Sequence, residues 1–568
     1  MARLLAALGL AAFVGLGWSM IRTSAPTYDE PVHLASGFTA LRTGTRYINA
    51  MDHPPLAEMW AALPLLALRP ATFFQNRDWA AERVYNYADF FLYKNIVDAE
   101  RMLNAARLWC LLSWGALLAV GILGWARRLG AAPAMAAAGL MLGFCPPLFT
   151  NAALVTTDAG SAVFFYLTFW LLREEKRSWG RWLAVGAAMG AAMCCKFSMF
   201  ILPFFVVTML LAEQKLARAS KGAPPGSSQR LKALSAGLAL AFLAGVVVIL
   251  ASYRFDSAVL YGKGLFATLS RLEQGRPSFF FGSYSTTGNR FYFPAALAVK
   301  TPLPLLLAAG AGVWALWRAA PPDQGRGGGL GPFRELVWLA APPAVYLLLA
   351  CFSKTQIGYR HILPLYPFLV VAAAVGLGRF WRRAWGKVAA VTLCVWLAAS
   401  VLRCHPDYIA YFNEAAGGPE GGLRCLGDSN LDWGQGLKAL AEGLRRMGNP
   451  PVYLCYFGVA DPSYYGIRYA PLGTITNVDR REGVVKPGDS DRVLFAISAT
   501  NLQATYYVDH SVFVWLKARR PRLTAGHSMF LYDLTDDADG IGRLAELLKA
   551  AGDPGEAARL RARHVRPA

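Results

Sequence analysis

Apolar residues gather in runs of about twenty along most of this chain. The run at 231–252 is a clear example, because its length matches what an α-helix needs to cross the hydrocarbon core of a bilayer. Charged residues fall mainly between the runs, so the pattern predicts an α-helical polytopic membrane protein. We expect about eleven transmembrane helices, at 3–21, 106–126, 132–149, 159–173, 182–196, 198–213, 231–252, 293–317, 335–352, 362–379 and 387–403.

The pattern changes near the end of the last of these runs. Beyond it the apolar stretches are short, as in the buried strands of a soluble α/β domain. Buried strands are predicted at 452–457, 493–497 and 529–532, and an amphipathic helix at 437–447. The predicted parts are a transmembrane domain at 1–404 with a large first outer loop at 22–105, an α/β domain at 405–540, and a short helical tail at 541–568.

Composition agrees with a membrane location. Of the 568 residues, 55% are hydrophobic and 16% are charged, whereas soluble domains have about 25% charged residues. The formal net charge is +21, but the basic residues sit in short loops between apolar runs, which argues against a nucleic-acid partner. Their bias predicts a multi-pass membrane protein with a cytoplasmic N-terminus and an extracytoplasmic C-terminal domain.

Acidic residues gather at the outer ends of the predicted helices. Asp29 and Glu30 directly follow the first apolar run, Asp52 and His53 come later in the same loop, and Asp158 lies at the next outer turn. A solvated loop is the simplest interpretation of any one of them. Three acidic positions on one face of a membrane are instead typical of a functional site, because ionisable groups there are costly.

At these positions the chain resembles a known family. The Asp-Glu pair after the first helix, followed by His-Pro-Pro-Leu at 53–56, is similar to the C-type glycosyltransferases of family 39. These include protein O-mannosyltransferases and bacterial lipid A aminoarabinose transferases. The resemblance continues at 196–198, 300–304 and 360–367 and covers residues 1–380 approximately. The stretch 428–435 resembles part of a C-terminal domain found in a bacterial subgroup, and this resemblance implies a location in the bacterial plasma (inner) membrane.

The resemblance implies a membrane glycosyltransferase that moves a sugar from a polyprenyl-phosphate donor to a hydroxyl acceptor at the outer face, with inversion. It assigns Asp29 as the general base and Glu30 as the residue that orients the acceptor or the sugar hydroxyls. The acceptor could be a protein, a lipid or a glycan, and the identity of the sugar stays open. Besides these substrates, membrane lipid is the expected partner.

The departing phosphate needs positive charge, and a guanidinium can hold phosphate in a forked geometry. We expect His53, Lys196, Arg360 and His361 to bind the donor phosphate, with Asp52 and Asp158 in supporting positions. His53 stands where the aminoarabinose transferases carry lysine. No metal is expected to be required, although a divalent cation held by the two aspartates and His53 stays open. For each basic residue the alternative is a side chain that only reaches to the membrane interface.

Two other functions are compatible with a polytopic chain. A lipid or sugar transporter or flippase would be built from internal repeats or broken helices that meet at the membrane midplane, whereas here the ionisable residues lie in the outer loops. A structural membrane subunit with a partner-binding C-terminal domain would leave the acidic pair at 29–30 without a role.

Overall fold

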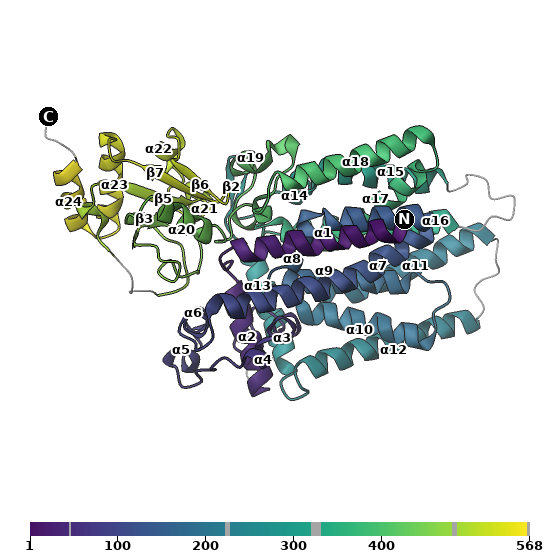
Figure 1. Ribbon diagram of the computed structural model, residues 1–568. Helices are drawn as coiled ribbons and strands as arrows, with labels where there is room; N and C mark the ends of the chain where they lie inside the picture. Colours follow the sequence, from purple (N-terminus) through teal and green to yellow (C-terminus); the bar gives the residue numbers. More distant parts are fainter. Residues whose placement is uncertain (45–46, 222–227, 320–330, 480–484, 565–568) are drawn as a thin grey trace.

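The computed structural model describes residues 1–44, 47–221, 228–319, 331–479 and 485–564. Long helices lie alongside one another, and a five-stranded sheet with its covering helices stands at one end of this bundle (Figure 1). The short helices of the first outer loop lie at the same end (Figure 1). The predicted fold class, a helical membrane protein with a small α/β C-terminal part, is confirmed.

By length and composition, seven of the described helices can cross a membrane, or nine segments if each of two bent helix pairs forms one span. The first four are α1 (Ala2–Thr23), α7 (Ala99–Gly143), Phe197–Leu216 in η1 (Phe197–Ile201) and α11 (Leu202–Lys221), and Leu231–Ser252 in α12 (Ser228–Ser252). The other three are Pro332–Ala350 in α16 (Gly331–Ala350), Tyr359–Phe380 in η2 (Tyr359–Leu365) and α17 (Tyr366–Phe380), and α18 (Ala384–Leu402). The bent pairs are α8 (Pro146–Ala152) with α9 (Thr157–Leu172), and α14 (Tyr292–Lys300) with α15 (Leu303–Arg318).

The two other predicted spans, at 132–149 and 182–196, are also helical, but they do not stand as separate long helices. Helix α7 is 45 residues long, but the backbone at Gly130 and Ala131 is not helical, so its second part corresponds to the span predicted from residue 132. Helix α10 (Trp179–Cys195) has 17 residues, which is the shortest length that crosses a bilayer. With these two, helical segments lie at all eleven predicted positions, and nine of them have the length and composition of a membrane span.

The outer loop at 22–105 folds into short helices: α2 (Glu30–Thr43), α3 (Pro55–Ala62), α4 (Leu65–Leu68), α5 (Arg77–Ala80) and α6 (Val84–Tyr93). Proline stands in the first turn of α2 and α3, where its missing N–H costs nothing. Helices α2 and α3 pack closely, since a Cβ on Gly37 would lie 2.0 Å from the Glu58 carbonyl oxygen. Farther along the chain, α13 (Val259–Gln274) precedes a hairpin of β1 (Ser278–Phe280) and β2 (Ser283–Ser285).

The C-terminal sheet has the strand order β4-β3-β5-β7-β6. Its strands are β3 (Val452–Cys455), β4 (Tyr469–Pro471), β5 (Leu494–Ser498), β6 (Leu523–Ala525) and β7 (Met529–Asp533). Strand β3 runs parallel to β4 and β5, whereas β7 runs antiparallel to β5 and β6. The three predicted strands are thus confirmed, and α20 (Leu437–Arg446) is the predicted amphipathic helix.

The predicted tail is part of this domain's core. Helices α23 (Ala538–Ala550) and α24 (Pro554–His564) bury Leu544 and Leu560 against the same cluster as Tyr453 and Phe495 of the sheet. This part also contains the short α-helices α19 (Gly418–Cys425), α21 (Ala499–Leu502) and α22 (Val514–Lys517). Amphipathic helices gain most of their stability from such packing, so the tail does not stand apart.

Candidate active site

A cavity of about 350 Å³ lies between the outer helices and the C-terminal part. Seven of the eight predicted site residues line it: Asp29, Asp52, His53, Asp158, Lys196, Arg360 and His361. They come from segments far apart in the sequence, namely the start of α2, the turn before α3, the start of α9, the end of α10 and the 3₁₀ helix η2 (Tyr359–Leu365). The structure therefore brings these seven residues together, while their roles stay predictions.

An ion network joins four of these side chains. Arg360 Nη1 donates to Asp29 Oδ2 at 2.8 Å and lies 3.6 Å from Asp158 Oδ2. Lys196 Nζ binds the other oxygen of Asp158, whose side chain is buried. Two cations and two carboxylates thus hold the cavity wall in one arrangement. Asp29 Oδ1 has no hydrogen-bond partner among the described residues.

One edge of the Arg360 guanidinium is unpaired in the described part of the chain. Its Nε is buried, and neither Nε nor Nη2 has a hydrogen-bond partner in the described part of the chain. Its flat face stacks on the indole of Trp433, with the Cζ atom 4.1 Å from the ring centroid. The Nε–Nη2 edge is a pair of parallel donors that suits a phosphate or carboxylate. His361 Nε2 is a second buried nitrogen without a partner among the described residues.

Glu30, the eighth predicted site residue, does not line the cavity. Its carboxylate is fully buried and accepts hydrogen bonds from Arg107 Nε at 2.8 Å and Arg107 Nη2 at 2.5 Å. It also accepts from the backbone N–H groups of Thr27, at 2.8 Å, and Val155, at 3.0 Å. Burial alone raises the pKa of Glu30, but the charge and hydrogen bonds of Arg107 outweigh it and lower the pKa. Glu30 therefore joins the start of α2 to α7 and to the turn before α9, and both of its carboxylate oxygens already accept hydrogen bonds.

His53 contributes hydrogen-bonding capacity to the cavity without positive charge. Burial, followed by the nearby charges of His33 and Lys196, holds the pKa of His53 well below its usual 6.5. Its ring packs edge-on against His33, with centroids 4.8 Å apart. His33 in turn bonds through Nδ1 to Glu58 Oε1 at 2.9 Å. Although burial opposes it, this bond raises the pKa of His33.

The structure adds cavity residues that the sequence did not single out: His33, Tyr85, Arg271, Arg276 and Asn477. His33 follows Asp29 by four residues on α2, so helical spacing already places both on one face. Arg271 belongs to α13 and Arg276 to the loop after it. Their only sequence signal was positive charge in an outer segment. Asn477 comes from the C-terminal part, and no local pattern connects it with the cavity.

The residues considered as ligands for a divalent cation already contact other side chains. Asp52 pairs with Arg271 at 2.5 Å, Asp158 pairs with Lys196, and His53 packs on His33. Over the described ranges, no group of three or more His, Cys, Asp or Glu side chains has the geometry to hold a metal ion. Beside its three aspartates, the cavity is lined by Lys196, Arg271, Arg276 and Arg360, whose positive charge suits an anionic ligand.

The fold and the cavity together define a multi-pass membrane protein, with a cavity lined by ionisable side chains where the helix bundle meets the C-terminal part. The family model described as "Dolichyl-phosphate-mannose-protein mannosyltransferase" matches residues 100–250. The matched segment contains Asp158 and Lys196 of the cavity. The predicted resemblance to family 39-like glycosyltransferases is confirmed by this match. No curated protein matches the chain.

Solved structures give weaker likenesses. ArnT from Cupriavidus metallidurans bound to undecaprenyl phosphate has a TM-score of 0.48 and 16% identity, over 93% of this chain and 97% of that chain. The same protein in the apo state has a TM-score of 0.44 and 17% identity over the same shares. The oligosaccharyltransferase AglB from Archaeoglobus fulgidus, in complex with an inhibitory peptide and a dolichol-phosphate, has a TM-score of 0.44 and 10% identity, over 71% and 55%.

Proposed function

We propose that this protein is a membrane glycosyltransferase that transfers a sugar from a polyprenyl-phosphate donor to a hydroxyl acceptor. The observation that carries the proposal is the cavity in which Arg360 binds Asp29 through one nitrogen, while its forked donor edge has no partner among the described residues. One guanidinium would thereby connect a base and a leaving phosphate. The family match over residues 100–250, whose description names a dolichyl-phosphate sugar, supports a lipid-linked donor.

The chemistry follows from these contacts. Asp29 Oδ1 takes the proton of the acceptor hydroxyl as the hydroxyl oxygen attacks the anomeric carbon of the sugar. The bond from that carbon to the phosphate oxygen breaks, and its electron pair stays on the phosphate. Arg360 and Lys196 stabilise the negative charge that develops there. Attack from the side opposite the phosphate inverts the anomeric centre.

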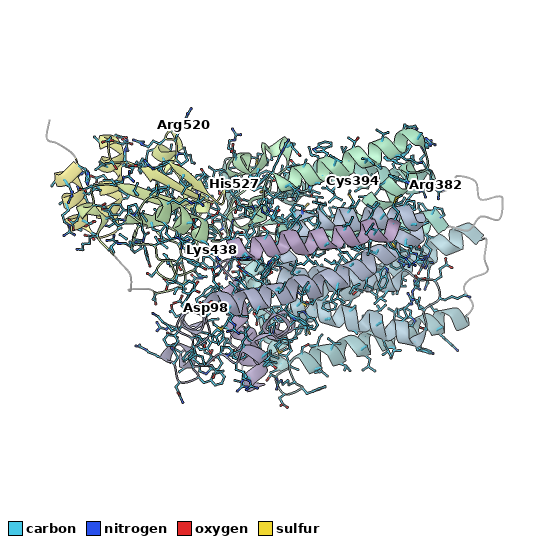
Figure 2. The ribbon with its side chains drawn as sticks, in the orientation of Figure 1. Asp98, Arg382, Cys394, Lys438, Arg520 and His527 are labelled. Carbon is cyan, nitrogen blue, oxygen red and sulfur yellow. The ribbon has the colours of Figure 1, made fainter. Side chains whose placement is uncertain are left out.

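The orientation of the chain belongs to the same proposal. The sheet domain and the cavity lie at one end of the bundle, while Arg382, from a loop rich in basic residues, lies at the other (Figure 2). Basic loops favour the cytoplasmic side of a bacterial inner membrane. The cavity and the C-terminal domain would then face the extracytoplasmic side, where the acceptor is a protein, lipid or glycan.

The test is a transfer assay on the full-length protein in detergent with polyprenyl-phosphate sugars, comparing wild type with Asp29→Asn. The variant should lose at least about 100-fold in kcat, which is a typical contribution of a general base, while it still binds the polyprenyl phosphate. Asp78→Asn is a matched control, because Asp78 is a similarly exposed carboxylate in the same outer loop that pairs with Arg83 away from the cavity. That control should keep wild-type turnover.

Two results would contradict the proposal. Near-normal turnover in Asp29→Asn would remove the base from this position. If folded wild-type protein cleaves no polyprenyl-phosphate sugar but moves one across a vesicle membrane, the protein is a transporter instead.

A further inference from the structure

The stretch 429–435 of the C-terminal part touches the two segments that carry Asp29 and Arg360. It follows α19 and lies at the junction between the sheet domain and the helix bundle (Figure 1). Additional polar contacts cross the same junction, where Lys438 Nζ binds Glu100 Oε1 at 2.6 Å and the Tyr464 hydroxyl binds Asp98. Figure 2 shows Lys438 and Asp98 at this junction.

On one side, this stretch binds the backbone just before Asp29. The Tyr28 N–H donates to the Trp433 carbonyl oxygen at 2.9 Å, and the Ala25 N–H donates to the Gln435 carbonyl oxygen at 3.0 Å. Both bonds fix the chain between the end of α1 and the start of α2. The position of the Asp29 carboxylate therefore depends on a backbone that the C-terminal domain supplies.

On the other side, the stretch binds the backbone around Arg360. Asn430 Oδ1 accepts the Tyr359 N–H at 2.9 Å, and the Ser429 hydroxyl donates to the Ile357 carbonyl oxygen at 2.6 Å. The buried indole of Trp433 lies against the Arg360 guanidinium. Stacking occupies the face of a guanidinium and leaves its in-plane N–H donors for other partners.

A third contact explains a basic residue that could have been taken for a phosphate ligand. Lys300 is buried, and its Nζ donates to the carbonyl oxygens of Ile409, at 2.9 Å, and Asn430, at 2.5 Å. The Asn430 amide also donates to the Tyr292 hydroxyl at 2.8 Å. The end of α14 is thereby joined to the same stretch.

The stretch is itself fixed to the sheet domain. Asp432 is buried and accepts the backbone N–H groups of Thr500, at 3.0 Å, and Gly434, at 3.2 Å. Thr500 belongs to α21, directly after β5. Gln435 Oε1 accepts the Trp433 N–H at 2.7 Å. These bonds anchor the stretch that carries Trp433 and Asn430 to the sheet domain.

We propose that residues 429–435 form a clamp that sets the distance between Asp29 and Arg360, with Trp433 as a positioning residue. The Trp433 indole holds the guanidinium so that its Nε–Nη2 edge is presented to the donor phosphate. The C-terminal domain is therefore part of the transferase site, to which it also contributes Asn477. This inference rests on the proposed function.

The experiment compares three variants of the full-length protein in the transfer assay. Trp433→Leu should raise the donor KM about tenfold, since it removes a stacked cation–π contact, with a smaller effect on kcat. Trp433→Phe keeps an aromatic face and should restore a donor KM near that of wild type. Trp515→Leu is the matched control, because the half-buried Trp515 stacks on Arg519, 5.1 Å away, in the same domain but outside the cavity.

Amide hydrogen exchange gives a second readout that does not need transferase activity. The Tyr359 N–H bonds the Asn430 side chain, so Asn430→Ala should speed exchange at 357–361. The Tyr28 N–H bonds the Trp433 carbonyl oxygen in the same stretch, so a loosened clamp should also speed exchange at 25–30. Exchange in the sheet strand Leu494–Ser498 should stay as in wild type, which would show that the domain remains folded.

The outcomes separate the clamp from the proposed function. Unchanged donor KM in Trp433→Leu, or a Trp433→Phe variant as impaired as Trp433→Leu, would overturn the role of Trp433. Unchanged exchange at both segments in Asn430→Ala would overturn the clamp. A wild-type protein without transfer activity would refute the proposed function, while the exchange comparison would still decide whether the clamp holds both segments.

Discussion

Glu30→Gln is expected to destabilise the protein, although Glu30 is the neighbour of the proposed base. The side chains of Glu30 and Arg107 are 0% and 1% exposed, and two hydrogen bonds join them. Glutamine keeps the shape of the side chain but removes its charge. Arg107 would then be a buried cation without a counter-charge, which is a costly state inside a protein.

The magnitude follows from the number of bonds lost. Breaking a buried ion pair by removing one partner costs about 3–5 kcal/mol. The glutamine amide also turns a donor toward the N–H of Thr27 or Val155, where an unmet backbone group adds about 1–3 kcal/mol. Even the lower limit, about 3 kcal/mol, changes the folding equilibrium more than 100-fold.

The assay is unfolding in detergent, followed together with turnover per folded molecule. Glu442→Gln is the control, because Glu442 forms exposed ion pairs with Arg445 and Arg446, and solvent-exposed pairs contribute little to stability. Glu30→Gln should unfold far more readily than this control, and its remaining folded fraction should retain turnover. Wild-type stability combined with lost turnover would refute this reasoning and return Glu30 to a role in orienting substrate.

Three further predictions concern other parts of the molecule. Arg360→Lys keeps the charge but loses the fork, so the donor KM should rise about tenfold while the acceptor KM stays constant; an acceptor effect alone would move the phosphate site. Burial raises the pKa of Asp432 to about 7, so between about pH 4 and 7 the folded state holds a proton that the unfolded state has lost, and the free energy of unfolding should fall as pH rises through this window. Asp432→Asn should flatten that slope, and an unchanged pH profile of thermal unfolding would contradict the assignment. Gly37→Ala places a Cβ 2.0 Å from the Glu58 carbonyl oxygen, so it should cost about 1–3 kcal/mol of stability in the same unfolding assay; a neutral effect would show that α2 and α3 can separate.

Much of the membrane part could be predicted because bilayer crossing imposes a length and an apolar composition on each helix. The same cost of burying charge made Asp29, Asp158 and Arg360 visible as residues at helix ends on one side. Helices that alternate direction bring such ends to one face, and the cavity gathers all three. The bend between α8 and α9 could not be predicted, since a continuous apolar run does not indicate where a helix changes direction.

The position of Glu30 could not be predicted from its place in the sequence. Adjacent residues at the start of a helix point about 100° apart, so Asp29 faces the cavity while Glu30 faces Arg107 of α7. The contribution of Trp433 and Asn477 was equally hidden. Their contacts join segments separated by many residues, and hydrophobic periodicity describes only the face that an element buries, not the partner it meets.

The position of Glu30 and the contacts of Trp433 were hidden for the same physical reason, and that reason also explains how the site is held together. The Asp29–Arg360 pair joins residues 331 positions apart, so local sequence cannot hold its geometry. Glu30 fixes the segment of Asp29 to α7 from inside the membrane domain, and Trp433 fixes both partners from the C-terminal domain. A base and a phosphate ligand need placement within a fraction of an ångström. The two supports should therefore fail differently: loss of Glu30 should unfold the helix junction, whereas loss of the Trp433 ring should leave a folded protein that binds donor poorly.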